Sequence, residues 1–164
     1  MKNIIYILYG SQTGNAQDIS EDIYTRLSNN ISYECIHMSL NSTIENNTFT
    51  FINNNNTNEE TKINIIIVCS TTGNGDAPET ANFFWRKLKN RNQPNNLLNG
   101  IEYTVLGLGD TNYDKFCNMG KNLDKRFNEL GAKRFMELHC ADEATGMEES
   151  VSLFIEKVVE YFEE

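Results

Sequence analysis

The chain has 164 residues, a length typical of one domain with a single core. Its 14 Lys and Arg against 23 Asp and Glu give a formal net charge of −9. This charge argues against binding to nucleic acid or to an anionic membrane surface, because both need clustered cations. Four cysteines without a C-x-x-C pair, and only two histidines, predict no metal site and reduced thiols in a cytoplasmic protein.

Short apolar runs alternate along the chain with stretches of helical periodicity. The expected strands cover residues 4–8, 33–38, 63–68, 103–106 and 134–138. Apolar residues three or four positions apart predict helices over residues 16–27, 79–88, 118–130 and 147–162. The alternation predicts an α/β fold with a parallel sheet and right-handed crossovers.

The segment between the second and third expected strands, residues 39–61, breaks this alternation. It is polar and includes the low-complexity run at residues 53–60, in a chain with 24 Asn. We expect one domain over residues 1–164, with residues 39–61 as an Asn-rich loop insertion. Most of that insertion is expected to be a mobile surface loop, with a short helix at no specified position.

Ligands of open α/β sheets bind beyond the carboxyl ends of the strands, so the loops after the first, third and fourth strands are candidate sites. The first loop, residues 10–16, combines glycines with Ser and Thr at the start of a helix. Backbone N–H groups, hydroxyls and the helix N-terminus can hold a phosphate without Lys or Arg. The loop has neither the Walker A motif nor G-x-G-x-x-G. The alternative is an ordinary capped helix start.

The other two loops are glycine-punctuated. Residues 70–78 place glycines on both sides of Asn74, which allows a close backbone approach to a flat ligand. Residues 106–117 carry Tyr113 on the ligand side of the sheet, where an aromatic ring can stack on a ligand. The alternatives are an ordinary turn and a surface aromatic residue. A phosphoacceptor receiver is disfavoured, since Ser11 and Ser70 stand where it would need acidic residues.

Three motifs in register carry a family resemblance: SQTG at 11–14, STTGNGD at 70–76 and LGLGD at 106–110. With them the chain resembles the FMN-binding, flavodoxin-like domain of the diflavin reductases. The resemblance implies a five-stranded parallel sheet of order 2-1-3-4-5 with helices on both faces. Residues 116–126 look closest to the methionine synthase reductase branch, whereas residues 10–14 are as close to the reductase of cytosolic iron–sulfur assembly.

The resemblance also implies which residues bind the cofactor. Residues 11–16 would hold the FMN phosphate. Residues 70–73 and 108–117 would flank the isoalloxazine ring, and Tyr113 would stack on it. Glu143 would be an acidic neighbour of the flavin, with Asp142 as the alternative. P450 reductase has a second ring-flanking Tyr where this chain has Thr72. The implied FMN-binding residues are Ser11, Gln12, Thr13, Gly14, Asn15, Ala16, Ser70, Thr71, Thr72, Gly73, Asn74, Gly75, Leu108, Gly109, Asp110, Thr111, Asn112, Tyr113, Asp114, Lys115, Phe116, Cys117 and Glu143.

The implied function is that of a one-electron carrier with no catalytic side chain of its own. FMN would accept electrons from an NADPH/FAD reductase module, in cis or in trans, and pass them to a protein acceptor such as cobalamin-dependent methionine synthase. The alternatives are a domain of the iron–sulfur assembly reductase and a free-standing flavodoxin-like shuttle. We read the sequence, which ends at Glu164, as lacking the NADPH/FAD module.

The acidic excess has a place in this interpretation. Several carboxylates lie in or near the expected ligand loops and would surround the exposed flavin edge, where they would steer basic partner surfaces. These residues are Asp76, Glu79, Asp110, Asp114, Asp142, Glu143, Glu148 and Glu149.

Overall fold

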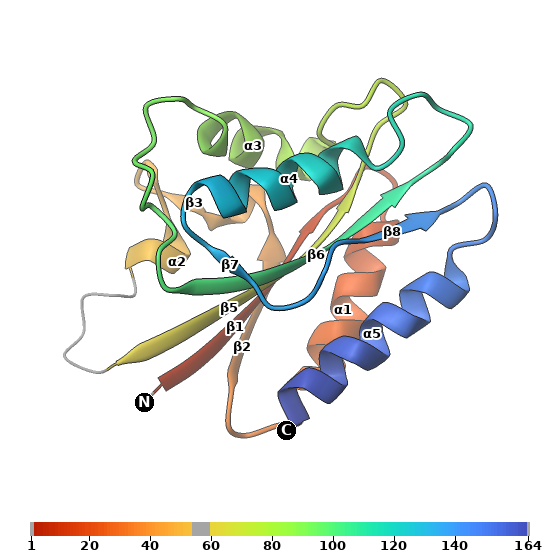
Figure 1. Cartoon of the computed structure of the whole chain (residues 1–164). Coiled ribbons are helices and arrows are strands. Elements are labelled where there is room, and N and C mark those ends of the chain that lie inside the picture. Colours follow the sequence, from red (N-terminus) through yellow and green to blue (C-terminus); the bar gives the residue numbers. More distant parts are fainter. Residues whose placement is uncertain (1, 54–59, 164) are drawn as a thin grey trace.

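A computed structural model describes residues 2–53 and 60–163 (Figure 1). A parallel sheet forms its centre, in the order β2-β1-β5-β6, and both β7 and β8 pair with the outer edge of β6. The expected 2-1-3-4-5 order is confirmed, with the fifth strand divided in two. The strands are β1 (Lys2–Gly10), β2 (Glu34–Ser39), β5 (Thr61–Ser70), β6 (Ile101–Gly109), β7 (Lys133–Arg134) and β8 (His139–Asp142).

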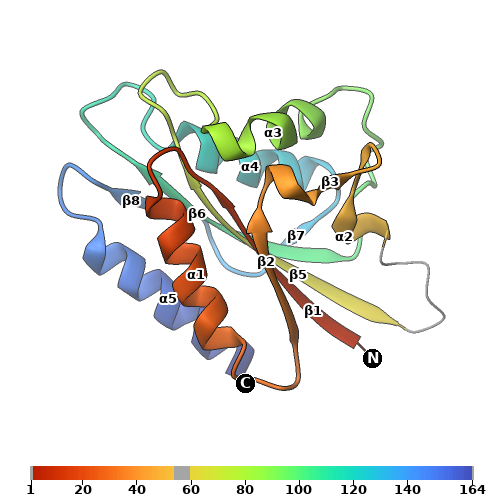
Figure 2. The same cartoon turned by 180° about the vertical axis from the view of Figure 1, so that it is seen from behind.

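Helices cover both faces of the sheet, as Figures 1 and 2 show from opposite sides. On one face α1 and α5 pack over Ile66 and Val68 of β5, and on the other α3 and α4 pack over Ile65 and Ile67. The near-continuous apolar run of β5 follows from this double cover. The helices are α1 (Asn15–Leu27), α3 (Asn82–Leu88), α4 (Asn118–Glu129) and α5 (Glu148–Glu163), with the 3₁₀ turn η3 (Glu79–Ala81) ahead of α3.

The end of α4 shows how a glycine sets the boundary of a helix. Gly131 has φ +98°, its N–H donates to the Asn128 carbonyl, and the Ala132 N–H donates to the Phe127 carbonyl. This is a Schellman motif, in which glycine supplies the left-handed residue that stops the helix. None of the helices in the described ranges is long and apolar enough to span a membrane.

The expected fifth strand at residues 134–138 is wrong in its position. The structure instead ends β7 at Arg134 and begins β8 at His139, with residues 135–138 outside both strands. Phe135 and Met136, although adjacent, both pack against the α1–α5 side of the sheet. Because side chains of a strand alternate between faces, two neighbours that pack on the same face interrupt it. Phe135 stacks on Tyr161 of α5 at 4.5 Å between ring centroids.

The expected surface loop after β2 is also corrected in its first part. Residues 40–53 fold into η1 (Asn41–Thr43), a β3–β4 hairpin (Ile44–Glu45 and Thr48–Phe49) and a short α2 (Thr50–Asn53). Asn46 and Asn47 turn the hairpin with φ of 52° and 62°, the left-handed pair that two-residue hairpins favour. Phe49 and Phe51 are buried against Phe84. Most of the low-complexity run, residues 54–59, lies outside the described residues.

Candidate functional site

Three loops meet at the carboxyl edge of the central strands. They follow β1, β5 and β6 and lie side by side at one end of the sheet (Figures 1 and 2). The chain order reverses here, because β2 lies on one side of β1 and β5 on the other. Such a switch point is where open α/β sheets bind ligands.

The loop after β1 is fixed to the start of η3. The Ser11 N–H donates to Thr80 Oγ1 at 2.7 Å, and the Thr80 hydroxyl donates back to the Ser11 carbonyl at 3.1 Å. Gln12 Oε1 accepts the Glu79 N–H at 2.9 Å. Within the loop, Ser11 Oγ accepts the Gly14 N–H at 2.8 Å. These bonds give the loop one shape, independent of any ligand.

The same loop leaves backbone donors free. Gly14 has φ +102° and precedes the first turn of α1. Within the described ranges, no protein acceptor takes the N–H groups of Gln12, Thr13, Asn15 or Ala16. These donors stand at the positive end of a 13-residue helix. The donor set fits a phosphate, which needs several N–H groups and no protein cation.

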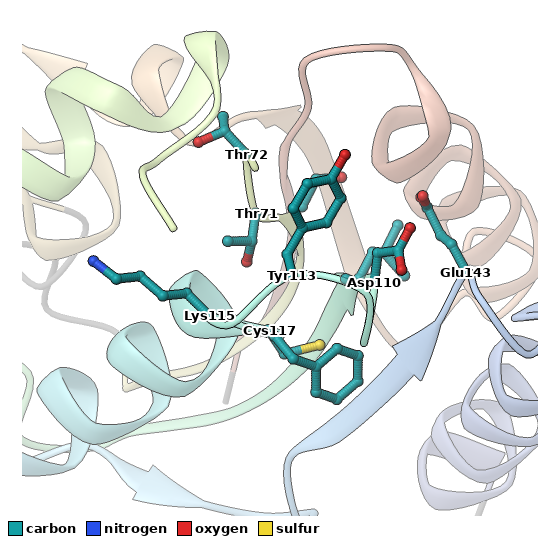
Figure 3. A pocket seen from close by; sticks show the side chains of 11 residues that line it. Thr71, Thr72, Asp110, Tyr113, Lys115, Cys117 and Glu143 are labelled. Carbon is teal, nitrogen blue, oxygen red and sulfur yellow. The ribbon is translucent and has the colours of Figure 1, made fainter. Parts of the chain in front are cut away.

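The loops after β5 and β6 enclose a small hollow (Figure 3). Its volume is about 70 Å³, below the roughly 300 Å³ at which ligand pockets begin. The Tyr113 ring lies against Gly73, and its Cε1 is 3.4 Å from where a Cβ added to Gly73 would be. A flat ring system therefore fits here only when Tyr113, which is 54% exposed, turns away from Gly73. The hollow is lined by Ser70, Thr71, Thr72, Leu108, Gly109, Asp110, Tyr113, Lys115, Phe116, Cys117 and Glu143.

The floor of the hollow is held by the two threonines of the β5 loop. Thr71 Oγ1 accepts the Met119 N–H at 3.1 Å, which joins this loop to the first turn of α4. The Thr72 hydroxyl donates to the Asp76 carbonyl and accepts the Asp76 N–H. Gly75, with φ +86°, completes this turn. The turn keeps residues 72–76 compact beside the hollow.

Asp142 and Glu143, left as alternatives by the sequence, have different positions. Asp142 accepts the Thr111 N–H at 3.0 Å, the Thr111 hydroxyl at 2.7 Å and the Ala144 N–H at 3.0 Å. The Thr111 N–H, followed by the other donors, holds the pKa of this carboxyl below its usual value. Glu143 lines the hollow. Of the two carboxylates, Glu143 is therefore the one that lies at the hollow, whereas Asp142 fixes the loop after β6.

Most of the predicted residues come together, but some face elsewhere. The Lys115 stem lies over Gly75, and its ammonium group points away from the hollow (Figure 3). The predicted residues that do not line the hollow, apart from those of the first loop, are Gly73, Asn74, Gly75, Thr111, Asn112 and Asp114. Sequence reasoning missed Thr80, whose partner Ser11 is 69 residues away. No local pattern signals a contact of this range.

The fold and these loops define the class of the protein as flavodoxin-like, a class with FMN at this switch point. The profile of the family described as Flavodoxin matches residues 7–154. The chain therefore belongs to the flavodoxin family, and FMN is the cofactor of this family. Oxidised flavodoxin 2 from Bacillus cereus superposes with a TM-score of 0.67 at 26% identity, over 94% of this chain and 95% of that one.

Curated relatives confirm the resemblance to diflavin reductases. Methionine synthase reductase of Bos taurus is 48% identical over 84 residues, which cover 51% of this chain and 12% of that protein. NADPH-dependent diflavin oxidoreductase 1 of Schizosaccharomyces pombe is 36% identical over 144 residues, which cover 87% of this chain and 23% of that protein. The chain thus spans less than a quarter of either relative.

Proposed function

We propose that this domain binds FMN at the switch point and works as a one-electron carrier of the diflavin reductase type. FMN, when bound, supplies the redox chemistry by taking up and releasing single electrons. The observation that carries the proposal is the phosphate-type donor loop beside an aromatic-lined hollow. The protein contributes position, partial burial and hydrogen-bond donors.

Each loop has a distinct task in this proposal. Residues 11–16 hold the FMN phosphate through the free N–H groups that follow Ser11. Residues 70–73 and 108–117 flank the isoalloxazine ring, and Tyr113 stacks on it after leaving Gly73. Glu143, which lines the hollow, is the acidic neighbour of the ring. No Lys or Arg stands in residues 8–18, so the phosphate depends on neutral donors.

The electron donor and acceptor are proposed from the relatives. The donor is an NADPH- and FAD-containing reductase module, and the acceptor is methionine synthase, in keeping with the 48% identical relative. The second candidate, an acceptor of NADPH-dependent diflavin oxidoreductase 1, is supported by the longer match of 144 residues. In either case carboxylates such as Asp110 and Glu143 at the hollow favour a basic partner surface.

Flavin titration tests the proposal. The purified chain is mixed with FMN, and quenching of flavin fluorescence is followed; we expect saturation at one FMN per chain. Riboflavin, which lacks the phosphate, is the matched ligand control and should bind at least about tenfold more weakly. Equal affinity for both ligands would contradict a phosphate role for residues 11–16.

The acceptor is tested separately with the loaded domain. After chemical reduction of the flavin, the rate of electron transfer is measured to cobalamin-bound methionine synthase and, in parallel, to an iron–sulfur assembly partner. Faster transfer to methionine synthase is expected, with a rate that falls as salt rises because charge steers docking. A preference for the other acceptor would replace the first candidate with the second.

A further inference from the structure

Cys117 occupies an unusual place beneath the hollow. It is fully buried and precedes α4 with φ 53° and ψ 27°, a left-handed conformation that is uncommon for a residue with a side chain. Its sulfur lies over β6, 3.5 Å and 3.0 Å from where Cβ atoms on Gly107 and Gly109 would be. Only glycines leave room for it there. In Figure 3 the sulfur of Cys117 points to the side on which the blue strand β8 lies.

Cys140 comes to the same spot from a different element. It lies on β8 and is the parallel partner of Gly107 on β6. Partners on neighbouring strands project to the same face of a sheet, and on Gly107 this is the face that Cys117 covers. The two thiols are near enough for each to shift the pKa of the other. Two thiols 23 positions apart in sequence therefore lie on the same face of the sheet at Gly107, under the ring-side loop.

The two sulfurs are chemically unequal. The neighbouring Cys117 thiol, aided by the Lys121 ammonium, lowers the pKa of the Cys140 thiol, while the pKa of Cys117 is raised. Cys140 is also the more exposed of the two, whereas Cys117 is buried. A partly exposed thiol of lowered pKa next to a buried thiol matches a nucleophilic and a resolving cysteine. The other two cysteines lack this: burial raises the pKa of both Cys35 and Cys69.

We propose that Cys140 and Cys117 form a dithiol site that hydrogen peroxide oxidises to a disulfide. The Cys140 thiol loses its proton and its sulfur attacks one peroxide oxygen; the O–O bond breaks, and the leaving hydroxide takes up the proton, which gives a sulfenic acid and water. The Cys117 sulfur then attacks the Cys140 sulfur, the S–O bond breaks, and the Cys117 proton leaves with the oxygen as water. In sum, two thiols and one peroxide give one disulfide and two waters.

The disulfide has a consequence for the hollow. Cys117 ends the loop of residues 108–117, which carries Tyr113, and the Tyr113 ring has to turn away from Gly73 before a flat ring can lie there. A covalent bond from Cys117 to β8 restrains that movement. Resting on the proposed function, the inference is that oxidation weakens FMN binding.

Mapping of the disulfide tests the chemistry without flavin. The reduced chain is treated with equimolar peroxide, free thiols are alkylated, and peptides are identified by mass spectrometry. We expect a peptide pair that joins Cys117 to Cys140 and is lost after dithiothreitol, in the wild type and in the matched control Cys35→Ser. Cys140→Ser should form no such pair. Oxidation of Cys35 as fast as Cys140, or equal alkylation of all cysteines before and after peroxide, would overturn the proposal.

Flavin titration of the same samples tests the consequence. Oxidised wild type should show an FMN dissociation constant about fivefold or more above that of the reduced protein, and peroxide-treated Cys140→Ser should show no change. Equal affinities of oxidised and reduced wild type would overturn the link to the hollow. Failure of the reduced protein to bind FMN would instead contradict the proposed function, and the disulfide map would stand independently.

Discussion

The two halves of the candidate site differ in how far the fold completes them. The loop after β1 is fixed on two sides, by Thr80 to Ser11 and by Gln12 to Glu79, and its free N–H groups are already in place. The loop after β6 is fixed at its start by Asp142, but Tyr113 lies across Gly73 and leaves only about 70 Å³.

This difference assigns separate contributions to the two halves. A preformed donor loop loses little conformational entropy when an anion binds, so it supplies affinity. The ring side has to rearrange first, and part of its contact energy is offset by that movement. We therefore expect the phosphate to dominate binding of FMN, and the ring loops to adjust how closely the flavin is covered.

The largest expected effect is on stability, and it distinguishes a methyl group added to Gly10, at the β1 loop, from one added to Gly73, on the ring side. In Gly10→Ala the new Cβ would lie 2.8 Å from both Ala81 Cβ and Cys69 Sγ, which have no free direction to move. We expect a loss of about 1–3 kcal/mol in the free energy of unfolding, from overpacking. In Gly73→Ala the nearest atom is 3.4 Å away on the exposed Tyr113 ring, and the change should stay within about 0.5 kcal/mol.

Urea unfolding of both variants measures this contrast, with the slope against denaturant checked for two-state behaviour. Similar losses in the two proteins would mean that the β1 loop is no more tightly packed than the β5 loop. The two halves of the site would then not differ in rigidity.

A smaller effect is expected from the side chain that fixes the β1 loop. Thr80→Val keeps the shape of the residue but removes both hydrogen bonds to Ser11. FMN binding should weaken about tenfold, or about 1.4 kcal/mol, while binding of riboflavin should not change. Thr80→Ser, which restores the hydroxyl, should recover the affinity. An equal loss for FMN and riboflavin in Thr80→Val would indicate a general defect of folding rather than a loss of phosphate contacts.

Thr80 also marks a boundary of what sequence can predict. The glycines, hydroxyls and spacing of residues 10–16 predict a phosphate loop locally, and the strand–helix alternation predicts the sheet that presents it. The reciprocal pair of Ser11 and Thr80 depends on how two loops 69 residues apart meet. Periodicity contains no information on such a contact.

The fifth strand and the segment after β2 differ from the sequence prediction for a related reason. Both are decided by tertiary packing: Phe135 and Met136 share one face of the sheet, and Phe49 and Phe51 reach the core from a polar surrounding. The choice between Asp142 and Glu143 is also beyond the sequence, because both residues are acidic. Only the register of β8 against β6, which pairs Asp142 with Gly109, gives the two carboxylates different positions.

On the ring side, the next largest effect is expected from Tyr113. Tyr113→Ala removes the aromatic surface that would stack on the flavin, and it also removes the ring that has to leave Gly73 first. These changes oppose each other, so we expect only a threefold to tenfold loss of affinity, about 0.5–1.5 kcal/mol. The loss should be the same for FMN and riboflavin, unlike that of Thr80→Val, and Tyr113→Phe should preserve binding. A loss confined to FMN would place Tyr113 at the phosphate instead.

The smallest effect concerns the acid side of the stability curve. The pKa of Asp142 is lowered by the Thr111 N–H and hydroxyl and by the Ala144 N–H, so this carboxylate stabilises the folded state only while it is ionised. Its contribution is complete above the unfolded pKa of about 3.9 and disappears as pH falls through the lower folded pKa.

Asp142→Asn should therefore reduce stability at neutral pH, and its difference from wild type should narrow below pH of about 4. Urea unfolding from pH 7 down to pH 3 measures both curves. Curves that stay parallel across this range would mean that folding does not lower the pKa of Asp142, and hence that Thr111 does not stabilise its ionised form. The loop after β6 would then have no firm attachment at its start, and the ring side of the site would be adjustable over its whole length rather than only around Tyr113.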